Sequence, residues 1–385
     1  MVIKYFIIKG MRLFIAVLFV AICISACAQA PSDSSRVKLH TYIGSVQDAV
    51  QFQYDTKDDL NQSMDCAKII SNPEGGFIAV YHHMNEGQFN VFLATSLDFL
   101  TWTIQAVMAN DAHQPCIYAD ESGGYFMAWE QNPNNHIKVA YYIDLNDLLM
   151  ANASDSYDIP QTLSSCAEGT PNIYSVTNNV IDIGFHFYDN CLVDRQARGT
   201  LTDFNVWQAA PQLLLDNSLL YWGVEGNIGD RDYFQYDGYD FGLIEGQYIP
   251  GDFGSWNTFI YDYSTGNAEP LEIVTHSGST AFANPTVTMM DLNGALAMVV
   301  TLFMPSEGAA PGEAGELMYY TFIDDNTSEC IVDLNSDGIV SVQDILLILS
   351  EFGCMTSCEN DVNQDGFVTV DDVLSILSEF GNFCV

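Results

Sequence analysis

Hydrophobic and β-branched residues between positions 36 and 325 occur in short runs, and glycine, asparagine, aspartate and proline separate these runs. This region contains no long stretch in which apolar residues recur with the period of a helix. Short aromatic and β-branched runs bounded by turn-forming residues are typical of strands. The turns come often enough for four-stranded antiparallel units, so we predict that this region is all-β.

A longer period of about 50–60 residues is superimposed on these runs. Its repeats open with DCAKII (65–70), QPCIYAD (114–120), EGTPNIYS (168–175), DRDYFQY (230–236) and ANPTVTMM (283–290). Each opening is followed by a second hydrophobic run, and in most units a third run follows. Five such units predict a five-bladed β-propeller over residues 61–326. Residues 28–60 form an N-terminal linker, in which VKLHTYI (37–43) is the candidate for a strand that closes the ring.

The C-terminal region repeats one short unit, DLNSDGIVSVQDILLILSEFG at 333–353 and DVNQDGFVTVDDVLSILSEFG at 361–381. In each copy, Asp or Asn occupies positions 1, 3 and 5 of a twelve-residue loop, glycine follows, and Asp ends the loop. With a backbone carbonyl at position 7 and a hydroxyl at position 9, this spacing suits Ca²⁺. The predicted ligands of two calcium ions are Asp333, Asn335, Asp337, Ile339, Ser341 and Asp344, and Asp361, Asn363, Asp365, Phe367, Thr369 and Asp372.

Each loop leads into a predicted amphipathic helix, 342–352 and 370–380, and no good helix precedes either loop. The apolar residues of the two helices are expected to pack against each other. They are Ile345, Leu346, Ile348 and Leu349, and Val373, Leu374, Ile376 and Leu377. The whole unit, at about 330–385, resembles the dockerin type I domain. That resemblance implies attachment to a cohesin-like receptor domain.

The first thirty residues, MVIKYFIIKGMRLFIAVLFVAICISACAQA, combine a basic start with an apolar run and small residues, which is typical of an export signal. Ile24-Ser25-Ala26-Cys27 resembles a bacterial lipobox, so residues 1–27 are interpreted as a lipoprotein signal with a lipid on Cys27. Cleavage after Ala28-Gln29-Ala30 is the alternative. The chain is therefore expected at the cell surface or in the periplasm as a lipoprotein, or secreted.

Charge and cysteine content agree with an exported protein. The chain has 50 Asp and Glu against 11 Lys and Arg, a formal net charge of −39, which argues against nucleic acid as a partner. The cysteines beyond the leader are even in number, which favours disulfides in an exported chain. They are Cys66, Cys116, Cys166, Cys191, Cys330, Cys354, Cys358 and Cys384. Two bridges are expected in the C-terminal module, with the pairing left open.

Candidate chemistry lies where the repeated units open, because residues there project into the channel of a propeller. Asp65, Gln114 and Glu168 stand at similar places in the first three units. Two carboxylates across a channel can break a glycosidic bond, one as proton donor and one as base. Residues interpreted as binding substrate or tuning a pKa are Gln114, Asp232, Arg231 and His186.

The stretch AEGTPNIYSVTNNVIDIGFHF (167–187) resembles the third blade of five-bladed propeller glycosidases, the arabinanase and β-xylosidase group called glycoside hydrolase family 43. The resemblance implies that Glu168 is the general acid and Asp65 the base of an inverting hydrolase. The chain departs from the pattern in three blades. In the third, Thr170 stands before Pro171, and in the first, the proline that normally follows the Asp is missing after Asp65. In the second, Gln114 replaces the Asp that tunes the pKa of the acid.

Two functions follow from these features. The first is an exported glycoside hydrolase that acts on a polysaccharide and carries a calcium-dependent attachment module. The alternative is a propeller that binds carbohydrate or protein without catalysis, which Gln114 favours because an amide cannot raise a pKa through like charge. A sialidase is a third hypothesis, for which the few arginines beyond the leader are an obstacle.

Overall fold

The computed structural model describes residues 30, 32–292, 294–323, 332–335, 340–355, 358, 360–363 and 365–381, without the side chains of 230 and 231. Predictions for Cys27, Cys330, Asp337, Ile339 and Cys384 therefore lie outside the described residues.

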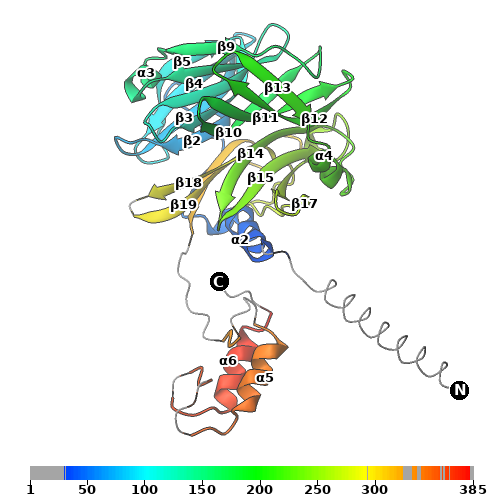
Figure 1. The fold of residues 1–385 in the computed structure, drawn as a ribbon. Helices are drawn as coiled ribbons and strands as arrows, with labels where there is room; N and C mark the ends of the chain where they lie inside the picture. Colours follow the sequence, from blue (N-terminus) through cyan, green and yellow to red (C-terminus); the bar gives the residue numbers. More distant parts are fainter. Residues whose placement is uncertain are drawn as a thin grey trace, which may run out of the picture.

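The body of the molecule is a five-bladed β-propeller, as predicted, built from five four-stranded antiparallel sheets (Figure 1). Blade 1 comprises β2 (Asp65–Ser71), β3 (Phe77–Asn85), β4 (Gln88–Ser96) and β5 (Thr103–Asn110). Blade 2 comprises β6 (Ala112–Ala119), β7 (Tyr125–Gln131), β8 (His136–Tyr142) and β9 (Asp155–Asp158). Blade 3 comprises β10 (Glu168–Thr177), β11 (Val180–Asp189), β12 (Val193–Thr202) and β13 (Val206–Pro211). Blade 4 comprises β14 (Ile228–Tyr236), β15 (Tyr239–Gln247), β16 (Trp256–Asp262) and β17 (Asn267–Pro270).

Blade 5 closes the ring with a strand from the other end of the chain. It comprises β18 (Ala283–Leu292), β19 (Ala295–Met304), β20 (Gly315–Phe322) and β1 (Gln51–Gln53). The closing strand β1 pairs antiparallel with β20, from Gln51 opposite Tyr320 to Gln53 opposite Met318. This pairing covers the exposed edge of the last blade and joins the two ends of the ring.

The prediction that VKLHTYI (37–43) closes the ring is wrong, because this segment lies inside helix α2 (Asp33–Gly44). Leu39 and Ile43 lie four residues apart on one face of α2, and both are completely buried. They pack with Phe241 and Tyr319 of blades 4 and 5. The burial of this helical face outweighs the β-branched composition of the segment.

Most hydrophobic cores of the propeller lie between neighbouring blades, and one lies between blade 4 and the segment at 213–224. One cluster joins blades 1 and 2 through Val80 and Met127, and another joins blades 2 and 3 through Ala128 and Ile183. Such face-to-face contact between sheets explains why the strands are so rich in buried residues. The remaining regular elements of the body are η1 (Val46–Asp48), α3 (Leu145–Leu149), α4 (Leu213–Leu220) and η2 (Phe253–Ser255).

The described part of the C-terminal region contains the two predicted helices, α5 (Val342–Ser350) and α6 (Val370–Ser378), each shorter than expected. The predicted packing of the two helices against each other is confirmed for half of the apolar residues. Ile345 and Ile348 of α5, and Val373 and Ile376 of α6, belong to one small core. The other half is wrong, since Leu346, Leu349, Leu374 and Leu377 are about half exposed.

The described cysteines form two disulfides, Cys166–Cys191 in blade 3 and Cys354–Cys358 in the C-terminal region. The expectation that all cysteines beyond the leader are joined in disulfides is wrong for Cys66 and Cys116, which are buried as thiols. They lie on separate inner strands, β2 and β6. In the part of the chain that the structure describes, no helix is long and apolar enough to cross a membrane.

Candidate functional site

The inner strand of every blade carries a β-bulge near its N-terminal end. The bulges lie between Asp65 and Lys68, His113 and Cys116, Gly169 and Asn172, Ile228 and Arg231, and Ala283 and Thr286. In four blades, a bulge residue adopts a left-handed backbone: Cys66, Gln114, Thr170 and Asn284, with φ between 43° and 55°. Bulges bend a strand and re-aim its side chains, so they shape this end of the channel.

This register corrects the expectation that Asp65, Gln114 and Glu168 hold matching places. The residue before each bulge is Asp65 in blade 1, His113 in blade 2 and Gly169 in blade 3. Gln114 therefore corresponds to the bulge residue Cys66, and Glu168 lies one position before the equivalent of Asp65. A shift of one residue along a strand turns a side chain to the opposite face.

Glu168 is buried, with 1% of its surface exposed. Its Oε1 accepts hydrogen bonds from the backbone N–H groups of Thr162, Leu163 and Ser164, at 2.5 to 2.9 Å. Its Oε2 is also buried and has no hydrogen-bond partner among the described residues. The carboxyl thus holds the loop that precedes blade 3, beside the Cys166–Cys191 disulfide.

Asp65 lies at the N-terminal end of β2, where its Oδ1 accepts a hydrogen bond from Ser63. Burial raises the pKa of Asp65, and the nearby Asp55 adds to the effect. Burial, with the Asp65 charge as a second cause, also raises the pKa of Glu316 well above its usual value. Asp65 therefore shares its surroundings with another carboxyl group, Glu316 of blade 5.

Side chains from one blade hold the bulge of the next. The N–H of Gln114 donates to Nδ1 of His82 at 3.1 Å, and the N–H of Thr170 donates to Glu130 at 3.3 Å. The N–H of Asn284 likewise donates to Glu245 at 2.6 Å. Blade 5 uses Glu316 of β20, which accepts from the N–H groups of Cys66 and Ala67 at 3.1 Å. These buried groups act as ties between blades.

His186 lies at the end of the channel where the inner strands begin, and both of its ring nitrogens have a neighbouring polar group. Its Nδ1 contacts the hydroxyl of Thr170, and its Nε2 lies 3.6 Å from Oδ1 of Asp194. Burial raises the pKa of Asp194 to about 6, against a lowering by Arg195. In blade 1, burial lowers the pKa of His82 to about 3. The side chain of Arg231, also predicted to bind substrate, lies outside the described residues.

Further along the inner strands, a buried ion pair crosses the channel from blade 1 to blade 4. Nζ of Lys68 contacts Asp232 and donates a hydrogen bond to the carbonyl of Val287 at 2.7 Å. Asp232 also accepts from Asn172 Nδ2 at 2.5 Å and from the N–H of Val287 at 2.8 Å. Asp232, predicted to bind substrate or tune a pKa, is thus fully occupied by this cluster.

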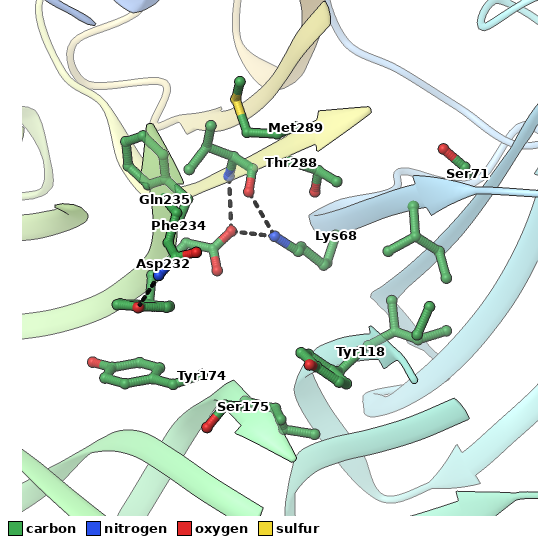
Figure 2. A pocket seen from close by; sticks show the side chains of 16 residues that line it. Lys68, Ser71, Tyr118, Tyr174, Ser175, Asp232, Phe234, Gln235, Thr288 and Met289 are labelled. Carbon is green, nitrogen blue, oxygen red and sulfur yellow. Dashed lines mark hydrogen bonds and ion pairs between the residues drawn. The ribbon is translucent and has the colours of Figure 1, made fainter. Parts of the chain in front are cut away.

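A cavity of 570 Å³ opens beyond this cluster, and its lining residues come from the middle and the C-terminal part of the five inner strands (Figure 2). Its floor is the Lys68–Asp232 pair, and Tyr118 and Tyr174 stand along one side. Ser71, Ser175, Gln235 and Thr288 add polar groups to the wall. Concave sites of this size, with aromatic walls and a few polar groups, are typical of small-molecule binding. The cavity lies at the opposite end of these strands from Asp65 and Glu168.

Sequence reasoning missed this cavity, because its wall comes from the middles of strands that look like ordinary core. Lys68 is the residue whose position in the sequence could have indicated the cavity. It is the lone basic residue in an apolar inner strand, DCAKIIS, and a lysine placed there needs a buried partner. Its partner, Asp232, is predicted from the sequence to bind substrate or tune a pKa, and that prediction does not include an ion pair with Lys68.

In the C-terminal region, the second predicted calcium loop is described more fully than the first. Asp361 accepts hydrogen bonds from the N–H groups of Asp365 and Gly366, while Asp372 accepts from those of Asn363 and Thr369. In the first loop, Asp344 likewise accepts from Leu334, Asn335 and Ser341. Gly366 has a φ of 95°, which only glycine adopts readily.

Carboxylate, amide and hydroxyl oxygens are the donors that calcium takes, so the residues present fit the ion in kind. Among the described residues, no three acidic, His or Cys side chains are arranged to hold a metal. In this conformation, the carboxylates of Asp344, Asp361 and Asp372 accept hydrogen bonds from backbone N–H groups.

Comparison with known proteins identifies the fold. No family model matches the chain, and no curated protein matches it in sequence. Among solved structures, a complex of BT0996 with RGII is similar, with a TM-score of 0.54 at 10% identity, over 76% of this chain and 96% of the other. The body therefore shares its fold with that protein.

Two glycosidase structures are also similar, at lower scores. An exo-1,5-alpha-L-arabinanase from a bovine ruminal metagenomic library gives a TM-score of 0.46 at 11% identity, over 71% of this chain and 95% of the other. A GH43 endo-arabinanase from Bacillus licheniformis gives 0.45 at 12% identity, over 70% and 96%. The structural neighbours of this five-bladed propeller thus include glycosidases, all at low sequence identity.

Proposed function

We propose that this chain is an exported polysaccharide-binding protein built on a glycosidase-like propeller. The observation that carries the proposal is the cavity on the channel axis, with tyrosines, hydroxyls and an amide along its wall. Aromatic rings offer apolar faces to sugar rings, and hydroxyl and amide groups match sugar hydroxyls. The aromatic content of the chain, 12%, is in keeping with such a role.

Binding without hydrolysis is preferred because of the position of Glu168. A general acid must reach the leaving oxygen of its substrate. Here one carboxyl oxygen accepts three backbone hydrogen bonds and the other is buried. Proton donation from Glu168 would require the loop at 162–164 to leave its place.

An inverting glycoside hydrolase with Glu168 as acid and Asp65 as base is the second candidate. The raised pKa of Asp65 favours it, since burial at the mouth of a channel is how enzymes tune carboxyl groups. In that case the substrate would occupy the end of the channel where the inner strands begin, near His186.

The two candidates are separated by assaying the full chain on arabinan, xylan, galactan and sulfated algal polysaccharides. Retention on the polysaccharide and release of reducing ends are measured together, for wild type, Glu168→Gln and Asp65→Asn. We expect retention of at least one neutral polysaccharide by all three proteins and no reducing ends. Reducing ends that appear with wild type and vanish with Glu168→Gln would establish the hydrolase instead.

The C-terminal region is proposed to attach the propeller to a larger assembly, by calcium-dependent binding to a cohesin-like receptor domain. Two calcium ions would be held by the oxygen ligands predicted above, including Asp361 and Asp372. The exposed leucines of α5 and α6 offer an apolar surface for such a receptor. A lipid on Cys27 is proposed as the membrane tether of the exported chain.

A further inference from the structure

We infer that the axial cavity receives the end of an uncharged glycan chain, with one sugar ring against Tyr118. This inference rests on the proposed binding function and adds to it the part of the glycan that is recognised. It places the site at the end of the channel where the inner strands finish, away from Asp65 and Glu168.

The floor of the cavity closes the channel. Lys68 and Asp232 span it from blade 1 to blade 4, and their side chains are only 9% and 2% exposed. Asn172 and the backbone of Val287 hold the same pair with further hydrogen bonds. Separation of a buried, hydrogen-bonded ion pair leaves an unpaired charge and is strongly unfavourable. A ligand can therefore enter the cavity from one side, but no polymer can thread through it.

The charge of the site selects an uncharged sugar. The ammonium of Lys68 is neutralised by Asp232, so the floor offers no net positive charge to a carboxylate or a sulfate group. The whole chain carries a formal net charge of −39, and its field repels anionic polymers. Uronic acids and sulfated sugars are thus disfavoured relative to neutral sugars.

The tyrosines of the cavity wall differ in whether their hydroxyl groups are already hydrogen-bonded within the protein. Tyr174 and Tyr233 stack with ring centroids 4.8 Å apart, and their hydroxyls are held by Tyr263 and Asp240. Tyr118, by contrast, is half-buried and faces the cavity.

The hydroxyls of Tyr118, Ser71 and Ser175 have no hydrogen-bond partner within the part of the chain that the structure describes. An aromatic face next to several available hydroxyls matches the apolar face and the polar rim of a sugar ring.

The test uses the full chain and the neutral polysaccharide that wild type retains best, with its short oligosaccharides as competitors. We expect Tyr118→Ala to raise the Kd for an oligosaccharide by about tenfold or more. Ser175→Ala, a small change at a half-buried hydroxyl, should raise it by about threefold. The matched control is Tyr221→Ala, which removes a tyrosine that is 83% exposed on the propeller surface, and its Kd should equal that of wild type.

Competition by chains of different length tests the preference for ends. Short and long chains should compete equally per mole of chain end, because only the end enters the cavity. Competition that follows total sugar mass, or wild-type affinity in both Tyr118→Ala and Ser175→Ala, would overturn the inference and leave the binding function standing. Wild type that retains none of the polysaccharides would instead defeat the binding function, and this inference with it.

Discussion

At the scale of single residues, the same side-chain type serves different roles according to its partners. Glu168 opens blade 3 in a sequence that resembles a catalytic motif, yet its carboxyl group holds a loop. Glu130 and Glu245 lie in the second strands of blades 2 and 4, where the sequence leaves open whether they line the channel rim or face solvent. Both are buried and tie one blade to the next. The residue type can be read along the chain, but the bulge in each inner strand decides where the side chain points.

Glu168→Ala tests the structural role of this carboxyl. Loss of the acceptor leaves three backbone N–H groups without a partner, so we expect the free energy of unfolding to fall by about 2–4 kcal/mol. Urea unfolding of the full chain measures the change. Glu168→Gln is the control, because its side-chain carbonyl still accepts these hydrogen bonds and should leave stability within about 1 kcal/mol of wild type. Equal stability of Glu168→Ala and wild type would show that the carboxyl does not hold the loop.

At the scale of elements, the five inner strands could be predicted, since each of the five repeated openings overlaps one of them, β2, β6, β10, β14 or β18. The closing strand could not, because the three residues of β1 carry too little pattern to be recognised. The segment taken for it, VKLHTYI, forms α2 because tertiary burial of Leu39 and Ile43 favours a helix there. The C-terminal helices were predictable because their apolar periodicity and capping residues agree, with Ser341 and Thr369 as caps of capping boxes.

The two acidic loops of the C-terminal region, 333–344 and 361–372, are predicted to bind one calcium ion each. If both bind calcium, calorimetric titration of the full chain should give two ions per chain, and Asp361→Ala should reduce this to one. The matched control is Asp371→Ala, which removes a neighbouring acidic residue that is not a predicted ligand and should leave two ions. No heat of binding in wild type, or two ions in Asp361→Ala, would contradict the predicted ligand set.

At the scale of the whole molecule, the number of blades could be predicted from the five repeated openings, whereas the site could not. Each inner strand contributes only a few residues to the channel, and those that meet, such as Lys68 and Asp232, lie 164 positions apart in the chain. A pattern of neighbouring residues in the sequence cannot predict a contact between residues so far apart in the chain. The cavity arises because five strands, each ordinary in sequence, continue past one closed floor, the Lys68–Asp232 pair, and surround the space beyond it.

The most direct test of the binding site is a crystal structure of the full chain grown with an oligosaccharide of the polysaccharide that it retains. We expect density for one sugar end between Tyr118 and Gln235, above the Lys68–Asp232 pair. Density beside Asp65 and His186, or a cleaved product at that end of the channel, would contradict this placement and favour the hydrolase.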